Sequence, residues 1–293
     1  MRVVNALTVD VEDYFHVEAF AGVISPDRWN GYPMRVESNT REILKMLGHR
    51  RIRATFFVLG WVADRCPGLI REILEAGHEV GCHGYNHQMI GRGDEKKFRN
   101  DIRRAKSVLE DLCGIPVISY RAPSYSVTVR TLWALDVLGE AGFEYDSSIF
   151  PVIHDQYGIP NAPRFPHSRF LRDGRRIIEF PPSTLSSCGV NVPVAGGGYF
   201  RILPYRFTSW AIRWINEKES QPVMFYFHPW EIDPDQPRIA ASPLSRFRHY
   251  HNLDSAADKF VRLLNDFSWA PMSEVVATSL HGNDALGEVV NGS

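Results

Sequence analysis

The sequence carries almost no excess of charge. Its 293 residues contain 33 lysines and arginines and 34 aspartates and glutamates, which gives a formal net charge of −1. A protein that binds nucleic acid or anionic lipid by electrostatic attraction needs a basic excess on one of its faces. The balance argues against both kinds of partner, and we expect no nucleic-acid binding.

Cysteine is scarce as well. The chain has four widely spaced cysteines, which are Cys66, Cys82, Cys113 and Cys188. Their spacing is typical neither of a Cys-x-x-Cys motif nor of a disulfide framework. We therefore expect reduced thiols, most of them buried.

A long hydrophobic run is also missing. The first apolar stretch, "VVNALTV" at residues 3–9, contains Asn5 and Thr8 and is followed by Asp10. Such a stretch reads neither as a signal peptide nor as a membrane span, so we expect no membrane span and a cytoplasmic location. Internal repeats and low-complexity linkers are absent too. The expected organisation is a single domain over residues 1–280, with a C-terminal extension from about 230 to 280 and a loose tail at 281–293.

What the sequence does contain is a regular alternation of short β-branched or aromatic runs with longer stretches of helical period. Expected strands lie at 3–9, 54–60, 78–82, 117–120, 143–148 and 222–227, and expected helices at 38–47, 68–77, 94–114, 128–142, 205–218 and 255–267. This order predicts an α/β fold with a mainly parallel sheet, and about seven such units favour an irregular barrel. Residues 150–200 are rich in proline and carry a turn at Asp173-Gly174, which predicts a hairpin-containing insertion.

Polar residues that could take part in catalysis follow several of the expected strands. Asp10 ends the first strand, His83 follows "EVGC", Arg121 follows "VISY", and His228 follows "PVMFYF". In a parallel barrel the carboxyl ends of all strands open onto one face, where such folds place their sites. The sequence therefore predicts that these side chains meet.

His83 and His87 are four residues apart, a spacing that lets two imidazoles hold one metal ion. Two neutral imidazoles and one carboxylate leave a coordination position free for water, as in a hydrolytic zinc site. The third ligand should come from the acidic cluster. Glu12 shares a strand face with Asp10, and Asp13 is the competing ligand.

A carboxylate near the metal that does not bind it can accept a proton from the attacking water. Asp10 fits this role, with Arg121 as the partner that orients it. His228, on another strand, could donate a proton to the leaving group.

With these residues in place, the chain resembles the NodB-type polysaccharide deacetylases of carbohydrate esterase family 4. The resemblance rests on "TVDVED" (8–13), "ATFFVLG" (54–60), "GHEVGCHGYNH" (77–87), "RAPSYS" (121–126) and "FYFHPW" (225–230), in the family's order. More narrowly, "TVDVEDYFHV" and "GGGYFR" look like the subgroup found beside exopolysaccharide gene clusters of bacteria with exosortase-type (PEP-CTERM) sorting systems.

The resemblance implies a distorted (β/α)7 barrel, a divalent ion that is usually Zn²⁺, and removal of the N-acetyl group from an amino sugar. Co²⁺ or another divalent ion also suits nitrogen and oxygen ligands. Carried over by motif, Asp10 is the base, Arg121 its partner and His228 the acid, while Glu12, His83 and His87 bind the metal. The N–H of Ser124 would help hold the oxyanion. Tyr125 and Trp230 would form walls of the acetyl pocket.

The sequence departs from the family's common pattern at three points. Val11 occupies the second position of the usual Asp-Asp pair, so that the carboxylate ligand maps to Glu12. The arginine motif has one extra residue between Pro123 and Tyr125. The acidic residue that usually tunes the acid histidine has two candidates here, Glu179 and Glu231.

The resulting hypothesis is a metal-dependent hydrolase that acts on an N-acetylated oligosaccharide or polysaccharide in exopolysaccharide biosynthesis. Two alternatives remain open at this stage. One is a cyclic imide or ureide amidohydrolase of the same fold. The other is a non-catalytic carbohydrate-binding or scaffold protein. The sequence does not identify the sugar, the linkage, the chain length or the oligomeric state.

Overall fold

One sheet runs through the molecule. Within residues 3–284, which the computed structural model describes, nine strands belong to this sheet, and seven of them are parallel neighbours in the order β10, β1, β2, β3, β4, β5, β7. These strands are β1 (Val4–Val11), β2 (Thr55–Val58), β3 (Glu79–Cys82), β4 (Ser119–Tyr120), β5 (Tyr145–Asp146), β7 (Arg176–Glu179) and β10 (Met224–Phe227). The predicted fold class is confirmed.

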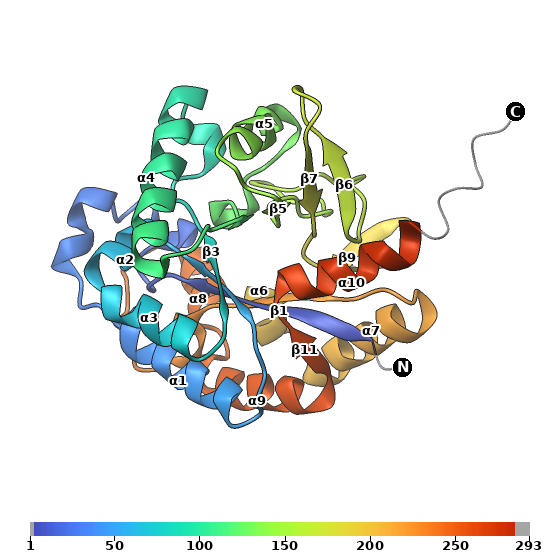
Figure 1. Cartoon of the computed structure of the whole chain (residues 1–293). Helices are drawn as coiled ribbons and strands as arrows, with labels where there is room; N and C mark the ends of the chain where they lie inside the picture. Colours follow the sequence, from blue (N-terminus) through green and yellow to red (C-terminus); the bar gives the residue numbers. More distant parts are fainter. Residues whose placement is uncertain (1–2, 285–293) are drawn as a thin grey trace, which may run out of the picture.

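Helices surround the sheet (Figure 1). They are α1 (Val36–Gly48), α2 (Gly60–Arg65), α3 (Pro67–Glu75), α4 (Glu95–Cys113), α5 (Trp133–Glu140), α7 (Tyr205–Lys218) and α9 (Ala256–Asp266). The apolar residues of α4 show why they pack there, because Phe98, Ile102, Ala105 and Leu109 recur every three or four residues and are all buried. No helix in the described part of the chain is long and apolar enough to cross a bilayer.

The two ends of the parallel row are β7 and β10, and in the described residues no strand ladder links them. The segments at Ser183 and Ala195 lie beside β10 instead. The N–H of Met224 donates to the hydroxyl oxygen of Ser183 at 2.8 Å, and the N–H of Tyr226 donates to the carbonyl of Ala195 at 2.7 Å. These contacts close a distorted barrel.

The first two glycines of "GGGYFR", Gly196 and Gly197, permit this closure. A Cβ on Gly196 would lie 1.8 Å from the carbonyl oxygen of Tyr226, and a Cβ on Gly197 would meet the Tyr226 ring at 2.7 Å. Both glycines also have positive φ, at 136° and 54°. Only a chain without side chains there can lie this close to β10.

The region 150–200 contains the predicted hairpin, with β6 (His167–Phe170) antiparallel to β7 across the Asp173-Gly174 turn. A second hairpin, β8 (Thr184–Ser187) with β9 (Val190–Pro193), follows it. The interpretation of this whole region as an insertion was wrong in one respect. β7 pairs in parallel with β5 and supplies the last parallel strand of the barrel.

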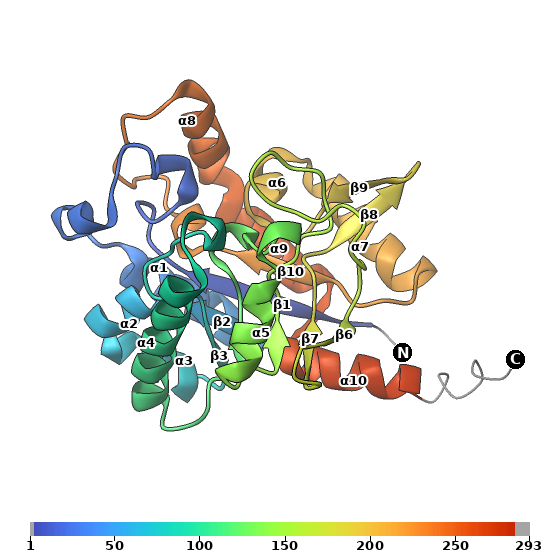
Figure 2. The ribbon, with the colours of Figure 1, turned by 90° about the horizontal axis from the view of Figure 1, so that it is seen from above.

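Four α-helices were not predicted from the sequence: α2 (Gly60–Arg65), α6 (Gly197–Ile202), α8 (Pro243–Tyr250) and α10 (Met272–Asp284). α10 follows β11 (Ser268–Ala270), which pairs with the start of β1, and it packs Met272, Val275 and Val276 against Ala6 and Phe57. It thus covers the amino-terminal end of the barrel, and α8 lies at the opposite end (Figure 2).

Two further expectations need correction. Residues 281–284, assigned to a loose tail, belong to α10, and the remainder of that tail, 285–293, lies outside the described residues. All four cysteines are free thiols, as expected. Cys66 and Cys82 are buried, but Cys113 is only half-buried and Cys188 is exposed.

Candidate active site

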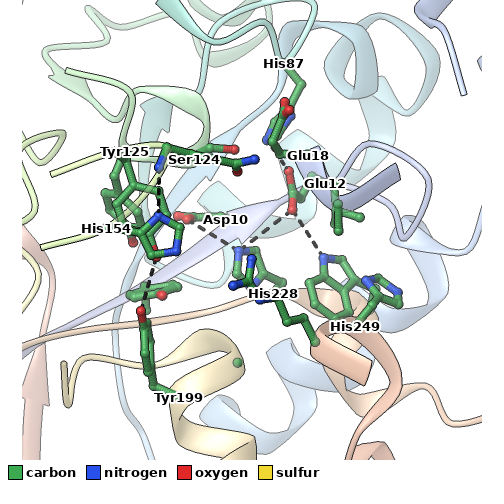
Figure 3. Close-up of a pocket in the computed structure, with 18 of the residues that line it drawn as sticks. Asp10, Glu12, Glu18, His87, Ser124, Tyr125, His154, Tyr199, His228 and His249 are labelled. Atoms are coloured by element: carbon green, nitrogen blue, oxygen red, sulfur yellow. Dashed lines mark hydrogen bonds and ion pairs between the residues drawn. The ribbon is translucent and has the colours of Figure 1, made fainter. Parts of the chain in front are cut away.

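The carboxyl ends of the parallel strands surround a cavity of about 360 Å³ (Figure 3). All predicted site residues except Arg121 line it: Asp10, Glu12, His83, His87, Ser124, Tyr125, His228 and Trp230. Arg121 has no exposed surface and contacts Asp10. The expected meeting of residues from distant parts of the chain is therefore observed.

Glu12, His83 and His87 form a cluster that could hold a metal ion. One ligand atom from each lies within 4.8 Å of the others, and all three side chains are buried. Oε2 of Glu12 is 2.5 Å from Nε2 of His87 but has no hydrogen-bond partner in the described structure. A buried carboxylate oxygen without a hydrogen bond, beside two imidazoles, matches the donor set of a divalent ion such as Zn²⁺.

The protonation of His83 and the charge of Glu12 suit this role. Nδ1 of His83 lies 2.8 Å from the carbonyl oxygen of Arg121, which fixes the proton on Nδ1 and leaves Nε2 free to bind a metal. Burial lowers the pKa of His83 to about 4, so that its imidazole is neutral at pH 7. Burial would also lower the pKa of His87, but the charge of the adjacent Glu12 outweighs burial and raises it. The space beside Glu12 thus favours a cation.

The structure separates Glu12 from Asp13. The Asp13 carboxylate accepts hydrogen bonds from the N–H groups of Tyr14, Arg35 and Val36, so it caps the start of α1. Burial raises the pKa of Asp13 to about 6. Glu12 faces the histidines instead, and the indole N–H of Trp230 donates to its Oε1 at 3.2 Å. Glu12 is therefore the carboxylate of the cluster.

Asp10 and Arg121 form a buried ion pair. Nη1 of Arg121 lies 2.6 Å from Oδ1 of Asp10 and donates to the hydroxyl oxygen of Thr8 at 2.7 Å. Its other nitrogens donate to the hydroxyl and carbonyl oxygens of Ser147. This network fixes Asp10 Oδ1 and leaves Oδ2 facing His228, whose Nε2 is 3.9 Å away.

His228 is held by Glu231, one of the two candidates for the tuning residue. Nδ1 of His228 is 2.7 Å from Oε1 of Glu231, which leaves Nε2 facing the cavity. Burial would lower the pKa of His228, but the hydrogen bond and charge of Glu231 outweigh burial and raise it. The other candidate, Glu179, accepts hydrogen bonds from the N–H groups of Ser148 and Ile149 and does not line the cavity.

Arg201 was missed by the sequence analysis, although it lies in the "GGGYFR" motif. Its Nε donates to Oε2 of Glu231 at 2.7 Å, and the side chain is 1% exposed. Hydrogen bonds therefore connect His228, Glu231 and Arg201 in series. The spacing His228-x-x-Glu231 is that of a capping box, and this signal could have favoured Glu231 over Glu179 from the sequence.

The backbone is strained at three positions around the cavity. His87, Ser124 and Tyr125 have positive φ values of 48°, 53° and 50°. Residues other than glycine rarely adopt this conformation, and such strain concentrates at functional sites. The Ser124–Tyr125 turn lies in the 3-10 helix η4 (Pro123–Tyr125) and places the Tyr125 ring 5.0 Å from that of Tyr226.

Comparison with known families divides the chain into two segments. Residues 28–145 match the family model described as polysaccharide deacetylase, with His83, His87 and Arg121 inside the match. This part of the chain is therefore similar to the polysaccharide deacetylases. Residues 147–277 match a domain of unknown function, DUF3473, which contains His228.

The boundary between the two matches falls at β5, inside the barrel. Strands β7 and β10 of the DUF3473 segment pair with β5 and β1 in one sheet. The deacetylase segment and the DUF3473 segment therefore build one barrel and one cavity together.

Individual relatives agree with this assignment. A peptidoglycan-N-acetylglucosamine deacetylase of Bacillus cereus is 32% identical over 98 residues, which are 33% of this chain and 36% of that protein. The chain thus spans less than two thirds of the length of the curated relatives it matches first.

Two solved structures share the fold over most of their length. A crystal structure from Mycobacterium smegmatis, assigned to the polysaccharide deacetylases, has a TM-score of 0.61 at 20% identity and covers 96% of this chain and 91% of that chain. The Puue allantoinase has a TM-score of 0.59 at 16% identity and covers 94% and 89%. At these identities the likeness concerns the fold alone.

Proposed function

We propose that the protein is a metal-dependent hydrolase that removes N-acetyl groups from amino sugars of a polysaccharide. The observation that carries this proposal is the arrangement of the Glu12–His83–His87 cluster, the Asp10–Arg121 pair and the His228–Glu231 pair around one cavity. Amide hydrolysis needs an electrophilic activator, a base and an acid around one carbonyl, and these three groups supply them.

A divalent ion held by Glu12, His83 and His87 would polarise the acetamide carbonyl and the attacking water. Asp10 accepts the proton of that water through the carboxylate that Arg121 orients. The N–H of Ser124 donates to the oxyanion that develops on the carbonyl oxygen. His228 then donates its Nε2 proton to the departing nitrogen, the C–N bond breaks, and acetate and a free amine result.

The substrate is proposed from the relatives. The Bacillus cereus relative is named for its action on peptidoglycan N-acetylglucosamine, so an N-acetylated glycan is the expected substrate class here. A role in exopolysaccharide biosynthesis and the use of Zn²⁺ are finer proposals. They are supported by the resemblance of "TVDVEDYFHV" and "GGGYFR" to one subgroup and by the two imidazoles in the cluster.

The test is acetate release from a panel of N-acetylated glycans by protein loaded with Zn²⁺ or Co²⁺, with Asp10→Asn as the inactive control. Allantoin and hydantoin belong in the panel because the Puue allantoinase shares the fold. Ring opening without acetate release would replace the proposal by the ureide alternative. Failure to bind one equivalent of metal, together with no acetate release, would favour the scaffold alternative.

A further inference from the structure

The cavity has an aromatic wall that the proposed chemistry does not use. The ring of His154 stacks on that of Tyr157, with centroids 3.7 Å apart and planes at 12°. The hydroxyl of Tyr157 is 3.5 Å from that of Tyr199. All three residues line the same cavity as the metal cluster. Flat rings beside a hydrolytic site can stack on the apolar face of a sugar that adjoins the reacting one.

Arg248, at the end of α8, lines this cavity too. The residue is exposed, and its guanidinium forms no ion pair with any carboxylate of the described residues. The lowered pKa of His154 has burial as its main cause, and the positive charge of Arg248 contributes to it. The cation is thus close to the aromatic wall.

The carboxylates that line the cavity already have partners. Asp10 pairs with Arg121, Glu12 with His87, and Glu18 with Arg92. Arg248 is therefore not the counter-charge of an acidic residue in the site. An unpaired guanidinium at a binding cavity suits a planar anion, because its N–H groups match the two oxygens of a carboxylate.

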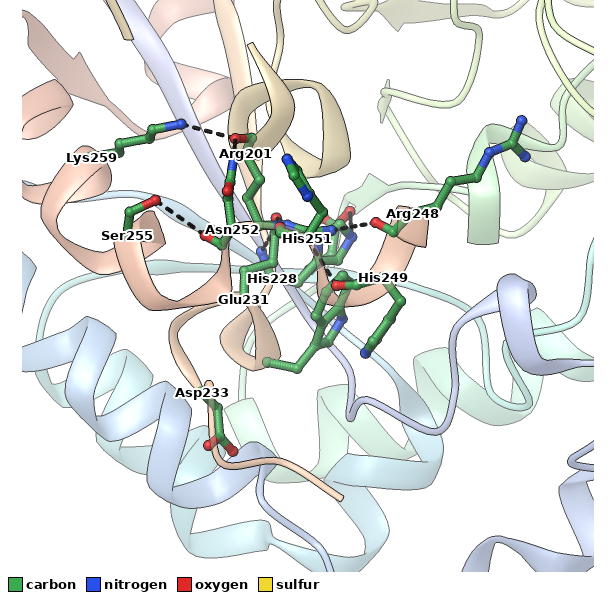
Figure 4. A network of polar contacts seen from close by, with 12 residues as sticks. Arg201, His228, Glu231, Asp233, Arg248, His249, His251, Asn252, Ser255 and Lys259 are labelled. Carbon is green, nitrogen blue, oxygen red and sulfur yellow. Dashed lines mark hydrogen bonds and ion pairs between the residues drawn. The ribbon is translucent and has the colours of Figure 1, made fainter. Parts of the chain in front are cut away.

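The main chain at Arg248 is held in place by hydrogen bonds from Arg201 (Figure 4). The buried guanidinium of Arg201 donates to the carbonyl oxygens of Arg248, His249 and His251 at 2.9, 2.8 and 2.7 Å. The same guanidinium holds Glu231 behind His228. The buried side chain of Arg201 therefore positions both His228, through Glu231, and the segment that carries Arg248.

We propose that Arg248 and the His154–Tyr157–Tyr199 wall form a subsite for a sugar carrying a carboxylate, next to the N-acetylated sugar. The substrate is then an acidic polysaccharide in which amino sugars adjoin uronic-acid residues. This inference rests on the proposed deacetylase function and adds the class of the neighbouring sugar.

The test compares two oligosaccharides of equal length. One is a hexasaccharide of alternating glucuronic acid and N-acetylglucosamine, and the other is the same hexasaccharide with its carboxylates reduced to alcohols. Acetate release from the acidic form should have a kcat/KM about tenfold higher, the size expected for one charged hydrogen-bonded contact. Arg248→Gln should abolish this ratio.

Arg246→Gln is the matched control. Arg246 lies on the same helix, is also exposed, and lines a separate surface hollow with Phe247 and Tyr250. This variant should keep the full preference for the acidic form. An unchanged preference in Arg248→Gln, or an equal loss in both variants, would overturn the subsite.

A binding measurement separates this inference from the proposed function. Calorimetric titration of the inactive Asp10→Asn variant with both hexasaccharides should show tighter binding of the acidic form, lost on adding Arg248→Gln. If that preference is found but active protein releases no acetate, the deacetylase proposal fails and the subsite stands. If acetate is released equally from both forms, or neither form binds preferentially, the subsite fails.

Discussion

Nδ1 of His228 lies 2.7 Å from Oε1 of Glu231, and this contact sets the protonation of the proposed acid. Burial alone would lower the pKa of His228, and Glu231 reverses that effect. Removal of the Glu231 charge therefore lowers the His228 pKa.

For Glu231→Gln we expect the alkaline limb of the kcat profile to move to lower pH, because His228 then loses its proton earlier as the pH rises. The value of kcat at pH 8 should fall more than KM changes. Glu179→Gln, which removes a buried carboxylate outside the cavity, is the control and should leave the limb in place. An unmoved limb in Glu231→Gln would show that His228 is not the acid.

Substitution of the adjacent residues Glu12 and Asp13 should affect different properties, metal binding for Glu12 and stability for Asp13. Glu12→Gln removes a ligand and should reduce the bound metal per chain, measured by elemental analysis, with little change in unfolding by urea. Asp13→Ala removes the acceptor of three backbone N–H groups and should lower the free energy of unfolding by about 1–3 kcal/mol. Loss of metal without loss of stability in Asp13→Ala would reverse the assignment.

Arg201→Ala should be among the most destabilising single changes in the chain. It leaves the Glu231 carboxylate buried without its cation and removes donors to three carbonyl groups. Breaking such a buried pair costs about 3–5 kcal/mol. Chemical denaturation measures this loss, and Arg248→Ala, an exposed site, should stay within about 0.5 kcal/mol of the unchanged protein. Equal midpoints for Arg201→Ala and the unchanged protein would contradict the role of Arg201.

Glu179 should make stability depend on pH. Burial and the charge of Asp146 raise the pKa of Glu179 well above its ordinary value of 4.5. A carboxyl group whose pKa is raised on folding stabilises the folded state fully at pH values below its pKa in the unfolded chain. This contribution is lost as the pH rises toward its pKa in the folded protein. The free energy of unfolding should therefore fall above about pH 4.5.

Glu179→Gln should flatten this fall, since an amide does not ionise in this pH range. Urea denaturation at a series of pH values measures the slope. Glu144→Gln, an exposed site beside β5, is the control and should keep the slope of the unchanged protein. Parallel curves for Glu179→Gln and the unchanged protein would rule out Glu179 as the cause of this fall.

The part of the site that could be predicted is the part fixed by strand ends. Asp10, His83, Arg121 and His228 each lie at or directly after a short apolar run, and parallel strands bring such ends together whatever their order. The choice of Glu12 over Asp13 needed the structure, because it depends on which carboxylate caps α1.

Arg201 and Arg248 could not be predicted, because they reach the site through α6 and α8. These are short helices placed by tertiary contacts and not by a strand register. Trp230 shows an intermediate case. The sequence placed it at the cavity, and the structure adds its hydrogen bond to Glu12.

The placement of β1 constrains how the chain reaches its native state during synthesis. This strand, near the first residue, pairs with β10 and β11, which end at Phe227 and Ala270. Because the chain is made from its amino end, β1 leaves the ribosome with one edge open until more than two hundred further residues have emerged. A truncation that stops at β5, between the two family segments, would leave that edge permanently open to other chains and should yield aggregates.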